Sequence, residues 1–140
     1  MISIVVPIFN EQEAIPELYR RVSEIMKSID LPFEMIIVDD GSVDESLEIA
    51  LGFHQKDGNI RVLELSRNFG HQMALAAGLD YASGDAVITM DGDLQHPPEL
   101  IPAMIEKWKE GHDVVFTCRR STAGASTIKA VTSRLFYSLF

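Results

Sequence analysis

Apolar segments with two different periods alternate along the chain. Short runs rich in valine and isoleucine are apolar at nearly every position, which is typical of strands buried on both faces of a parallel sheet. Segments whose apolar residues recur every three or four positions lie between these runs and predict amphipathic helices. The five predicted strands are Ile2–Ile8, Glu34–Val38, Arg61–Leu65, Ala86–Met90 and Asp113–Thr117.

Helices are predicted in each interval between the strands. The first has an apolar face from Ile15 to Ile29, and the second begins at Ser42, which with Glu45 has the spacing of a capping box. The third runs from about residue 70 to residue 82 and the fourth from residue 97 to residue 111. This alternation predicts right-handed βαβ units and an open, doubly wound α/β sheet with helices on both faces.

The composition is that of an ordinary globular domain. The chain has 140 residues, of which 46% are hydrophobic and 24% charged. Cys118 is the single cysteine, so no internal disulfide forms, and the start of the chain has no basic region typical of a signal peptide. No run approaches the ~18 apolar residues of a membrane-spanning helix. We expect a cytoplasmic domain. A further helical pattern from Ile128 to Leu139 reaches the end without a cap, and we expect a longer protein to continue it.

The net charge of −9 is distributed unevenly. An acidic body repels nucleic acid, so we expect no nucleic-acid partner. Residues 111–140 contain four basic and one acidic side chains, a net charge of +3. This basic end is either a solvated helix face or a contact with an anionic membrane or a phosphorylated ligand.

Polar side chains follow every predicted strand. Because ligands bind at the carboxyl ends of strands in open α/β sheets, these side chains predict one site at one edge of the sheet. The groups are Phe9-Asn10-Glu11, Asp39-Asp40-Gly41-Ser42, Ser66-Arg67-Asn68, Asp91-Gly92-Asp93-Leu94-Gln95 and Cys118-Arg119-Arg120.

The two carboxylates of Asp91 and Asp93 are the clearest candidate metal ligands. Spaced two apart at a strand end, they have the chemistry to share a divalent cation and its bound diphosphate, and Gln95 offers a further oxygen. The alternative is an ordinary solvated turn, since aspartate and glycine are common in turns.

Asp39 and Asp40 also have two interpretations. They form either an acidic turn or a site in which one carboxylate accepts hydrogen bonds from a base or a ribose. Arg67, Arg119 and Arg120 have the fork-shaped donors that neutralise a diphosphate, although a single surface arginine is usually just solvated. His71 and His96 adjoin the predicted site, but the sequence reveals no partner that would give them a role as acid or base.

Three motifs together resemble glycosyltransferase family 2. They are Val5-Val6-Pro7-Ile8-Phe9-Asn10-Glu11, Val38-Asp39-Asp40-Gly41-Ser42-Val43-Asp44 and Met90-Asp91-Gly92-Asp93-Leu94-Gln95-His96-Pro97-Pro98-Glu99. The similarity is closest to the polyprenyl-phosphate glycosyltransferases, which include dolichyl-phosphate mannose synthases and bactoprenol glucosyltransferases. Arg67-Asn68-Phe69-Gly70 is similar to the bactoprenol branch. The resemblance implies a GT-A fold and an inverting transfer of a sugar from a nucleoside diphosphate to a polyprenyl phosphate.

The resemblance also implies a role for each matching residue. Pro7, Asn10 and Glu11 would line the nucleotide pocket, Asp39 would contact the base, Asp91 would lie near the ribose or the metal, and Asp93 and Gln95 would hold Mg²⁺ or Mn²⁺ against the diphosphate. Arg119 would meet a phosphate, and the adjacent Arg120 is the alternative in register. Asp40 and Arg67 complete the candidate substrate-binding residues, and Asp91, Asp93 and Arg119 are the candidates for catalysis. Gly92 stands where the family more often has alanine, a difference expected to be harmless.

Residues 1–120 are accordingly expected to form the nucleotide-sugar-binding domain, and residues 121–140 the start of an acceptor-side helix near the membrane. The expected partners are a nucleoside diphosphate sugar, a polyprenyl phosphate and the inner face of a membrane, with self-association left open. One alternative is a nucleotide-sugar-binding module without catalysis. A receiver-like regulatory domain is disfavoured because no acidic pair follows the first strand and no lysine follows the fifth. A dinucleotide dehydrogenase is disfavoured because the first strand has no G-x-G-x-x-G after it.

Overall fold

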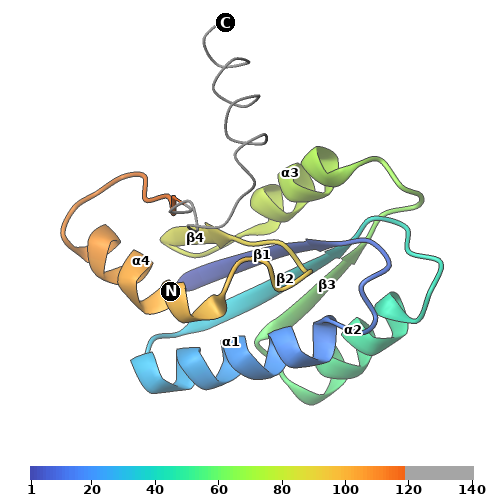
Figure 1. The fold of residues 1–140 in the computed structure, drawn as a ribbon, viewed down its shortest axis with the longest axis horizontal. Coiled ribbons are helices and arrows are strands. Elements are labelled where there is room, and N and C mark those ends of the chain that lie inside the picture. The colour runs from blue at the N-terminus through green and yellow to red at the C-terminus, as the bar shows by residue number, and fades with distance from the viewer. Residues whose placement is uncertain (119–140) are drawn as a thin grey trace, which may run out of the picture.

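Four parallel strands form the sheet of the computed structural model, which describes residues 1–118 (Figure 1). Their order is β3-β2-β1-β4. The strands are β1 (Ile2–Ile8), β2 (Phe33–Asp39), β3 (Ile60–Glu64) and β4 (Ala86–Thr89). The helices are α1 (Ile15–Ile29), α2 (Ser46–Lys56), α3 (His71–Tyr81), the short 3₁₀ helix η1 (Pro98–Leu100) and α4 (Ile101–Lys109).

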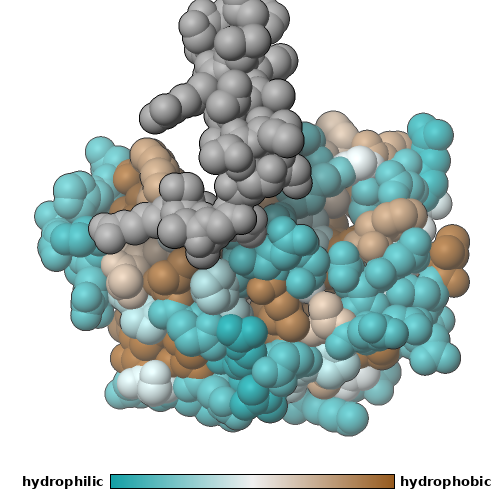
Figure 2. All heavy atoms as spheres, in the orientation of Figure 1, coloured by the Kyte–Doolittle hydropathy of each residue, from teal (hydrophilic) through white to brown (hydrophobic). Residues whose placement is uncertain are grey.

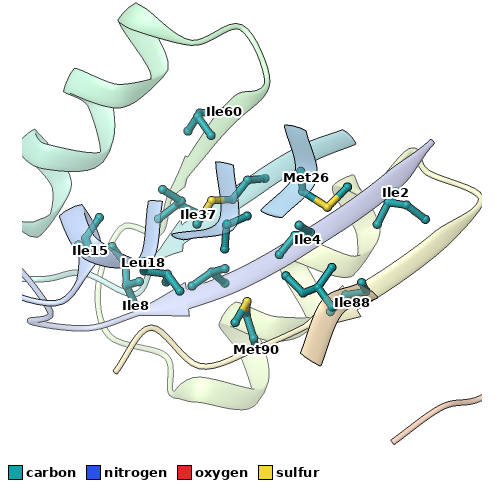
Figure 3. Packing of buried hydrophobic residues seen from close by; sticks show 14 of the residues in the cluster. Ile2, Ile4, Ile8, Ile15, Leu18, Met26, Ile37, Ile60, Ile88 and Met90 are labelled. Atoms are coloured by element: carbon teal, nitrogen blue, oxygen red, sulfur yellow. The ribbon is translucent and has the colours of Figure 1, made fainter. Parts of the chain in front are cut away.

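The helices cover both faces of the sheet, as the sequence predicts. Alternate residues of β1 such as Ile4 and Ile8 pack with Leu18 of α1 in the larger core, which also includes residues of α2 and α4 (Figure 3). On the opposite face, Val5 and Val38 pack beneath α3. Since β2 and β3 lie on one side of β1 and β4 lies on the other, the strand order reverses between β1 and β4, which confirms the doubly wound arrangement.

Gly78 sets the distance between α3 and the sheet. A Cβ atom at this position would collide with Cγ1 of Val5 and lie 3.0 Å from Cγ2 of Val38. Helix α3 therefore rests with its backbone directly on the two central strands, and its first residue, His71, is placed above the carboxyl ends of these strands.

The prediction that the strands are buried on both faces is confirmed for the two central strands, β1 and β2, but not for the edge strands. Every residue of β1 is buried, and so is every residue of β2 except the half-buried Phe33. The edge strands β3 and β4 each have a single buried residue, Ile60 and Ile88. The short apolar runs of β3 and β4 resemble those of a central strand, so the sequence pattern did not distinguish edge strands from central ones.

Helix α2 begins three residues later than the capping box predicts, because its N-cap is Glu45 and not Ser42. Its first residue is Ser46, and its N-cap Glu45 makes no side-chain capping bond. The hydroxyl of Ser42 instead accepts the backbone N–H of Asn10, at 2.9 Å. Asp44 accepts the N–H of Ser46 at 3.0 Å and so satisfies one of the free donors at the start of the helix.

The predicted fifth strand is wrong for this structure, because residues 113–117 belong to no strand. The side chains of Val114 and Phe116 are 78% and 77% exposed, and Val115 alone is partly buried. Cavities of about 230 and 240 Å³ lie between this segment, β4 and α4. Without apolar contacts on two faces, the five residues have too little burial to hold a strand against the edge of β4.

The surface in Figure 2 is mainly hydrophilic, with hydrophobic residues in separate patches. Among the described residues, no helix combines the length and the apolar character needed to cross a membrane. Arg119, Arg120, the final helical pattern and the expected division after residue 120 all lie outside the described residues.

Candidate functional site

The carboxyl ends of the strands meet at one edge of the sheet. Ile8, Asp39 and Glu64 are register partners at the ends of β1, β2 and β3. Strand β4 ends earlier, with Thr89 opposite Val5, and the N–H of Met90 continues the pairing by donating to the Val5 carbonyl at 3.1 Å. The loops after all four strands therefore start side by side, as the sequence predicts.

Side-chain hydrogen bonds fasten the loop after β1 to the loop after β2. Asn10 has a left-handed backbone (φ 57°), and its Oδ1 accepts the N–H of Val43 at 2.9 Å. Ser42 and Ser46 accept the backbone N–H groups of Asn10 and Glu11 at 2.9 and 2.8 Å. The amide oxygen of Asn10 thus holds the loops together, a scaffolding contact distinct from the pocket-lining role expected for it.

A second set of bonds extends this connection. Asp44 Oδ2 accepts the N–H of Gln12 at 3.3 Å, and Gln12 Oε1 accepts the N–H of Glu45 at 3.0 Å. Because each loop donates to and accepts from the other, the two loops are joined into one unit. We call these two loops, together with the turn after β4 that includes Asp91 and Asp93, the rim of the sheet.

The adjacent acids Asp39 and Asp40 have different environments, although both are buried. The two oxygens of Asp40 accept the backbone N–H groups of Phe69 and Gly70 at 2.8 and 2.9 Å. Both oxygens are therefore engaged in holding the start of α3, so the structure gives Asp40 a structural contact at a position expected to bind substrate.

Asp39 is 1% exposed and has one oxygen without a partner. Its Oδ2 accepts the N–H of Ser42 at 3.1 Å, while Oδ1 has no hydrogen-bond partner among the described residues. An unpaired buried oxygen is costly, so this atom is a candidate acceptor for a donor supplied by a ligand.

The turn after β4 packs directly on β1. A Cβ atom on Gly92 would lie 2.8 Å from Cγ2 of Ile8 and 3.3 Å from the carbonyl oxygen of Pro7. In this chain the absence of a methyl group at position 92 allows the close contact of this turn with Ile8.

The same turn has an unusual backbone at Leu94. Its φ of 62° is left-handed, a conformation that is rare and strained for a branched residue, and its side chain packs against the main core. The N–H of Gln95 donates to Asp93 Oδ1 at 2.9 Å. The core contact of Leu94 and this hydrogen bond hold the exposed Asp93 carboxylate at the rim.

The rim concentrates negative charge. Burial, followed by repulsion from Asp93 and Asp44, raises the pKa of Glu11 above its ordinary value. Glu11 and Asp93 come from different strand ends, so the electrostatic coupling shows that the structure brings together two of the predicted site residues. Bringing a cation between them would relieve the repulsion.

The oxygen ligands at this rim fit Mg²⁺ or Mn²⁺ better than a softer metal. Within residues 1–118, no three histidine, cysteine, aspartate or glutamate side chains are grouped closely enough to enclose an ion. Mg²⁺ is usually held by one or two carboxylates and by substrate phosphates. Asp91 and Asp93, together with Gln95, fit that open arrangement.

Arg67 lies over an aromatic ring. Its guanidinium carbon is 4.6 Å from the centroid of the Phe69 ring, and both side chains are exposed. A cavity of about 180 Å³ beside this loop is lined by Pro7, Phe9 and Asp40 and by Asn68, Gly70, His71 and Ala74 of the following segment. The structure thus places Pro7 and the Arg67 loop at the same edge as Asp91.

Two histidines given little weight by the sequence contact the site. His96 Nδ1 lies 3.2 Å from Asp91 Oδ2, and His71 Nε2 lies 3.5 Å from Asp91 Oδ1. Their positions at the start of a helix and directly after Gln95 were visible in the sequence, but their common partner was not. Arg119 and Arg120 lie outside the described residues.

A family model described as "Glycosyl transferase family 2" matches residues 3–139. A bactoprenol glucosyl transferase of Shigella phage SfV is 44% identical over 138 residues, which are 99% of this chain and 45% of the relative. An undecaprenyl-phosphate 4-deoxy-4-formamido-L-arabinose transferase of Salmonella choleraesuis is 44% identical over 121 residues, which are 86% of this chain and 37% of the relative. The chain thus spans less than half the length of these relatives.

A solved structure is also similar. The mannosyltransferase PcManGT from Pyrobaculum calidifontis, in complex with GDP-Man and Mn²⁺, superposes with a TM-score of 0.64 at 25% identity. The match covers 76% of this chain and 31% of the mannosyltransferase.

Proposed function

The chain belongs to glycosyl transferase family 2, and from this premise we propose that it is the donor-binding part of an inverting, metal-dependent glycosyltransferase. Its donor is a nucleoside diphosphate sugar and its acceptor a polyprenyl phosphate. The relatives named for bactoprenol and undecaprenyl phosphate support the acceptor class. The GDP-Man in the mannosyltransferase structure supports the donor class.

The observation that carries the proposal is the seating of the Asp91–Gln95 turn. It lies against the end of β1, where the strand order reverses, and it faces Glu11 across the rim. Open α/β sheets bind ligands at such a switch point. A cluster of carboxylates is a poor site for a diphosphate alone and a good one for a diphosphate with its cation.

We assign the donor contacts as follows. The unpartnered Oδ1 of Asp39 accepts a hydrogen bond from the base, and Pro7 and Glu11 line the nucleotide pocket. Asn10 supports this pocket by tying its two loops together. Asp91 holds the ribose or the metal ion, Asp93 and Gln95 hold the metal ion, and Arg67 neutralises phosphate charge.

Mg²⁺ or Mn²⁺, when bound, would neutralise the charge that develops on the leaving diphosphate. The protein residues supply position: Asp93 is held by the Gln95 N–H and by the core contact of Leu94. A lipid phosphate is already ionised at neutral pH, its second pKa being about 6. It needs no strong general base, so orientation and charge are the main tasks of this site.

Arg119, with Arg120 beside it, is our candidate for binding the acceptor phosphate and assisting catalysis. A forked guanidinium suits a phosphate. We further propose that the whole protein works at the inner face of the membrane, with residues 121–140 leading toward it.

The experiment is a calorimetric titration of the 140-residue chain with UDP-glucose and GDP-mannose, each with and without Mn²⁺. We expect one donor to bind only with the metal present. Asp93→Asn should abolish this binding, because it removes a ligand charge. The matched control is Asp80→Asn, an exposed residue near the end of α3, which should bind normally. Normal binding by Asp93→Asn would overturn the metal assignment.

Transfer of sugar to a short polyprenyl phosphate separates catalysis from binding. Metal-dependent binding without transfer would identify a nucleotide-sugar-binding module. Failure of folded protein to bind either donor would contradict the assignment of a donor site to this chain.

A further inference from the structure

The carboxylate of Asp91 lies between two imidazoles from different parts of the chain. One oxygen is 3.2 Å from His96 Nδ1, and the other is 3.5 Å from His71 Nε2. The side chains of Asp91, His71 and His96 are 40%, 51% and 49% exposed, so close packing does not force them together. All three, with Pro7, line a cavity of about 70 Å³.

The backbone that carries each of these side chains is fixed independently. His71 follows Gly70, whose N–H is held by the buried Asp40. His96 precedes Pro97, with φ −68°, and the buried Pro98. Asp91 follows Met90, which is paired with β1 through the Val5 carbonyl. The meeting of three independently held segments at one carboxylate is therefore a property of the fold.

Asp91 lies in a region of concentrated negative charge. Glu11 and Asp93 repel one another across the rim, and Asp91 adds a third carboxylate to the same edge. Two imidazole nitrogens within 3.5 Å of the Asp91 carboxylate are placed to disperse part of that charge by donating to it. Metal-binding carboxylates in proteins are commonly oriented by such outer donors.

We infer that His71 and His96 are positioning residues that hold Asp91 in the orientation needed to bind the metal–nucleotide complex. His71 donates from Nε2 and His96 from Nδ1, each to its own oxygen of Asp91. The distances of 3.2 and 3.5 Å would shorten when Asp91 engages its ligand. The ligand in this inference rests on the proposed function, whereas the contacts themselves do not.

The first test is spectroscopic and needs no ligand. Opposite nitrogens face Asp91, so neutral His71 must carry its proton on Nε2 and neutral His96 on Nδ1. Two-bond ¹⁵N–¹H spectra at about pH 8.5, where an ordinary imidazole is neutral, distinguish the two tautomers. The chain has four histidines, so single substitutions assign every signal.

Asp91→Ala should abolish the preference of His96 for the Nδ1–H form. His54 provides the internal control, because its Nδ1 lies 2.6 Å from the carbonyl oxygen of Ile60 and its tautomer should not change. An Nε2–H tautomer for His96 in the wild-type protein, or an Nδ1–H tautomer that persists in Asp91→Ala, would overturn the inference.

The second test uses the position of the donor within the side chain. The amide nitrogen of glutamine is placed like Nε2 of histidine, and that of asparagine like Nδ1. We therefore expect His71→Gln and His96→Asn to keep the affinity for Mn²⁺ with UDP or GDP. His71→Leu and His96→Leu should weaken it by about 10- to 100-fold, as for other outer donors. The exchanged variants, His71→Asn and His96→Gln, should bind like the leucine variants.

Equal binding by all six variants would contradict the positioning role. If the wild-type chain binds neither UDP nor GDP with Mn²⁺, the proposed function fails for this chain. The tautomers of His71 and His96 then still decide whether the contacts exist. The two failures are therefore distinguishable.

Discussion

The carboxylate of Asp40 accepts the backbone N–H of Gly70 at 2.9 Å, and this bond joins the end of β2 to the start of α3. Its other oxygen accepts the N–H of Phe69 at 2.8 Å. Asp39, one residue earlier, contacts Ser42 in its own loop. Asp40 therefore has both oxygens in structural contacts, whereas Asp39 Oδ1 has no hydrogen-bond partner among the described residues.

Replacing Asp40 with alanine should lower the free energy of unfolding by about 2–3 kcal/mol, because it leaves two backbone N–H groups without acceptors. Asp40→Asn retains one acceptor oxygen and should lose less. Urea denaturation of both variants measures the difference. Asp80→Ala on the exposed side of α3 is the control, and an Asp40→Ala variant as stable as this control would refute the structural role.

Gly92→Ala should lower the free energy of unfolding by about 1–3 kcal/mol, because its methyl group enters the space of Ile8 Cγ2. The cost should shrink in an Ile8→Ala background, where that atom is absent. A double-mutant cycle measures this coupling. Additive effects of the two substitutions would show that the contact does not determine the cost.

Leu94→Gly should be more stable than Leu94→Ala by about 1 kcal/mol, because glycine relieves the left-handed backbone and alanine does not. Both variants lose the same core contact. At Leu75, inside α3, the order should reverse, since glycine is about 1 kcal/mol worse than alanine in a helix. Thermal unfolding of the four variants compares the two positions, and the same order at both would contradict the strain at Leu94.

Glu34 should make the stability of the protein sensitive to acid. Burial alone would raise its pKa, but hydrogen bonds from Ser3 and Ser83 and the ion pair with Arg61 outweigh burial and hold the pKa below 4.5. The carboxylate therefore stabilises the folded state above pH 4.5 and loses this contribution as the pH falls through the lowered pKa.

The variant Glu34→Gln should accordingly be less stable than the wild-type protein at neutral pH, and the difference should diminish in acid. Urea denaturation at pH 7 and at about pH 3.5 gives both differences. A constant difference between the two pH values would show that Glu34 does not act through its charge.

The sequence predicted those elements best whose boundaries are determined by burial of apolar residues. Strand β1 has the predicted bounds because all seven residues are buried, and α1 follows the apolar positions from Ile15 to Ile29. The carboxyl-edge site was predictable because parallel strands bring their ends together. The fifth strand failed because valine and phenylalanine at residues 114–116 carry the same apolar signal whether or not anything covers them.

The roles of individual side chains in the rim depended on contacts between distant segments. Ser42 and Asn10 are 32 residues apart, and their bond took the place of the predicted capping box. Nothing local distinguishes Asp39 from Asp40, or links His71 to Asp91. These assignments became possible only when the strand register placed the loops beside each other.

The close approach of Gly78 to Val5 and Val38 makes α3 a rigid arm whose far end carries His71. A larger side chain at residue 78 would lift this arm from the sheet, and the displacement would reach the edge seven residues away along the helix. A substitution in the apolar interior would in this way impair ligand binding while leaving every polar residue of the rim intact. Such variants would look like losses of a ligand-binding side chain, although the cause is a change in the spacing between α3 and the sheet.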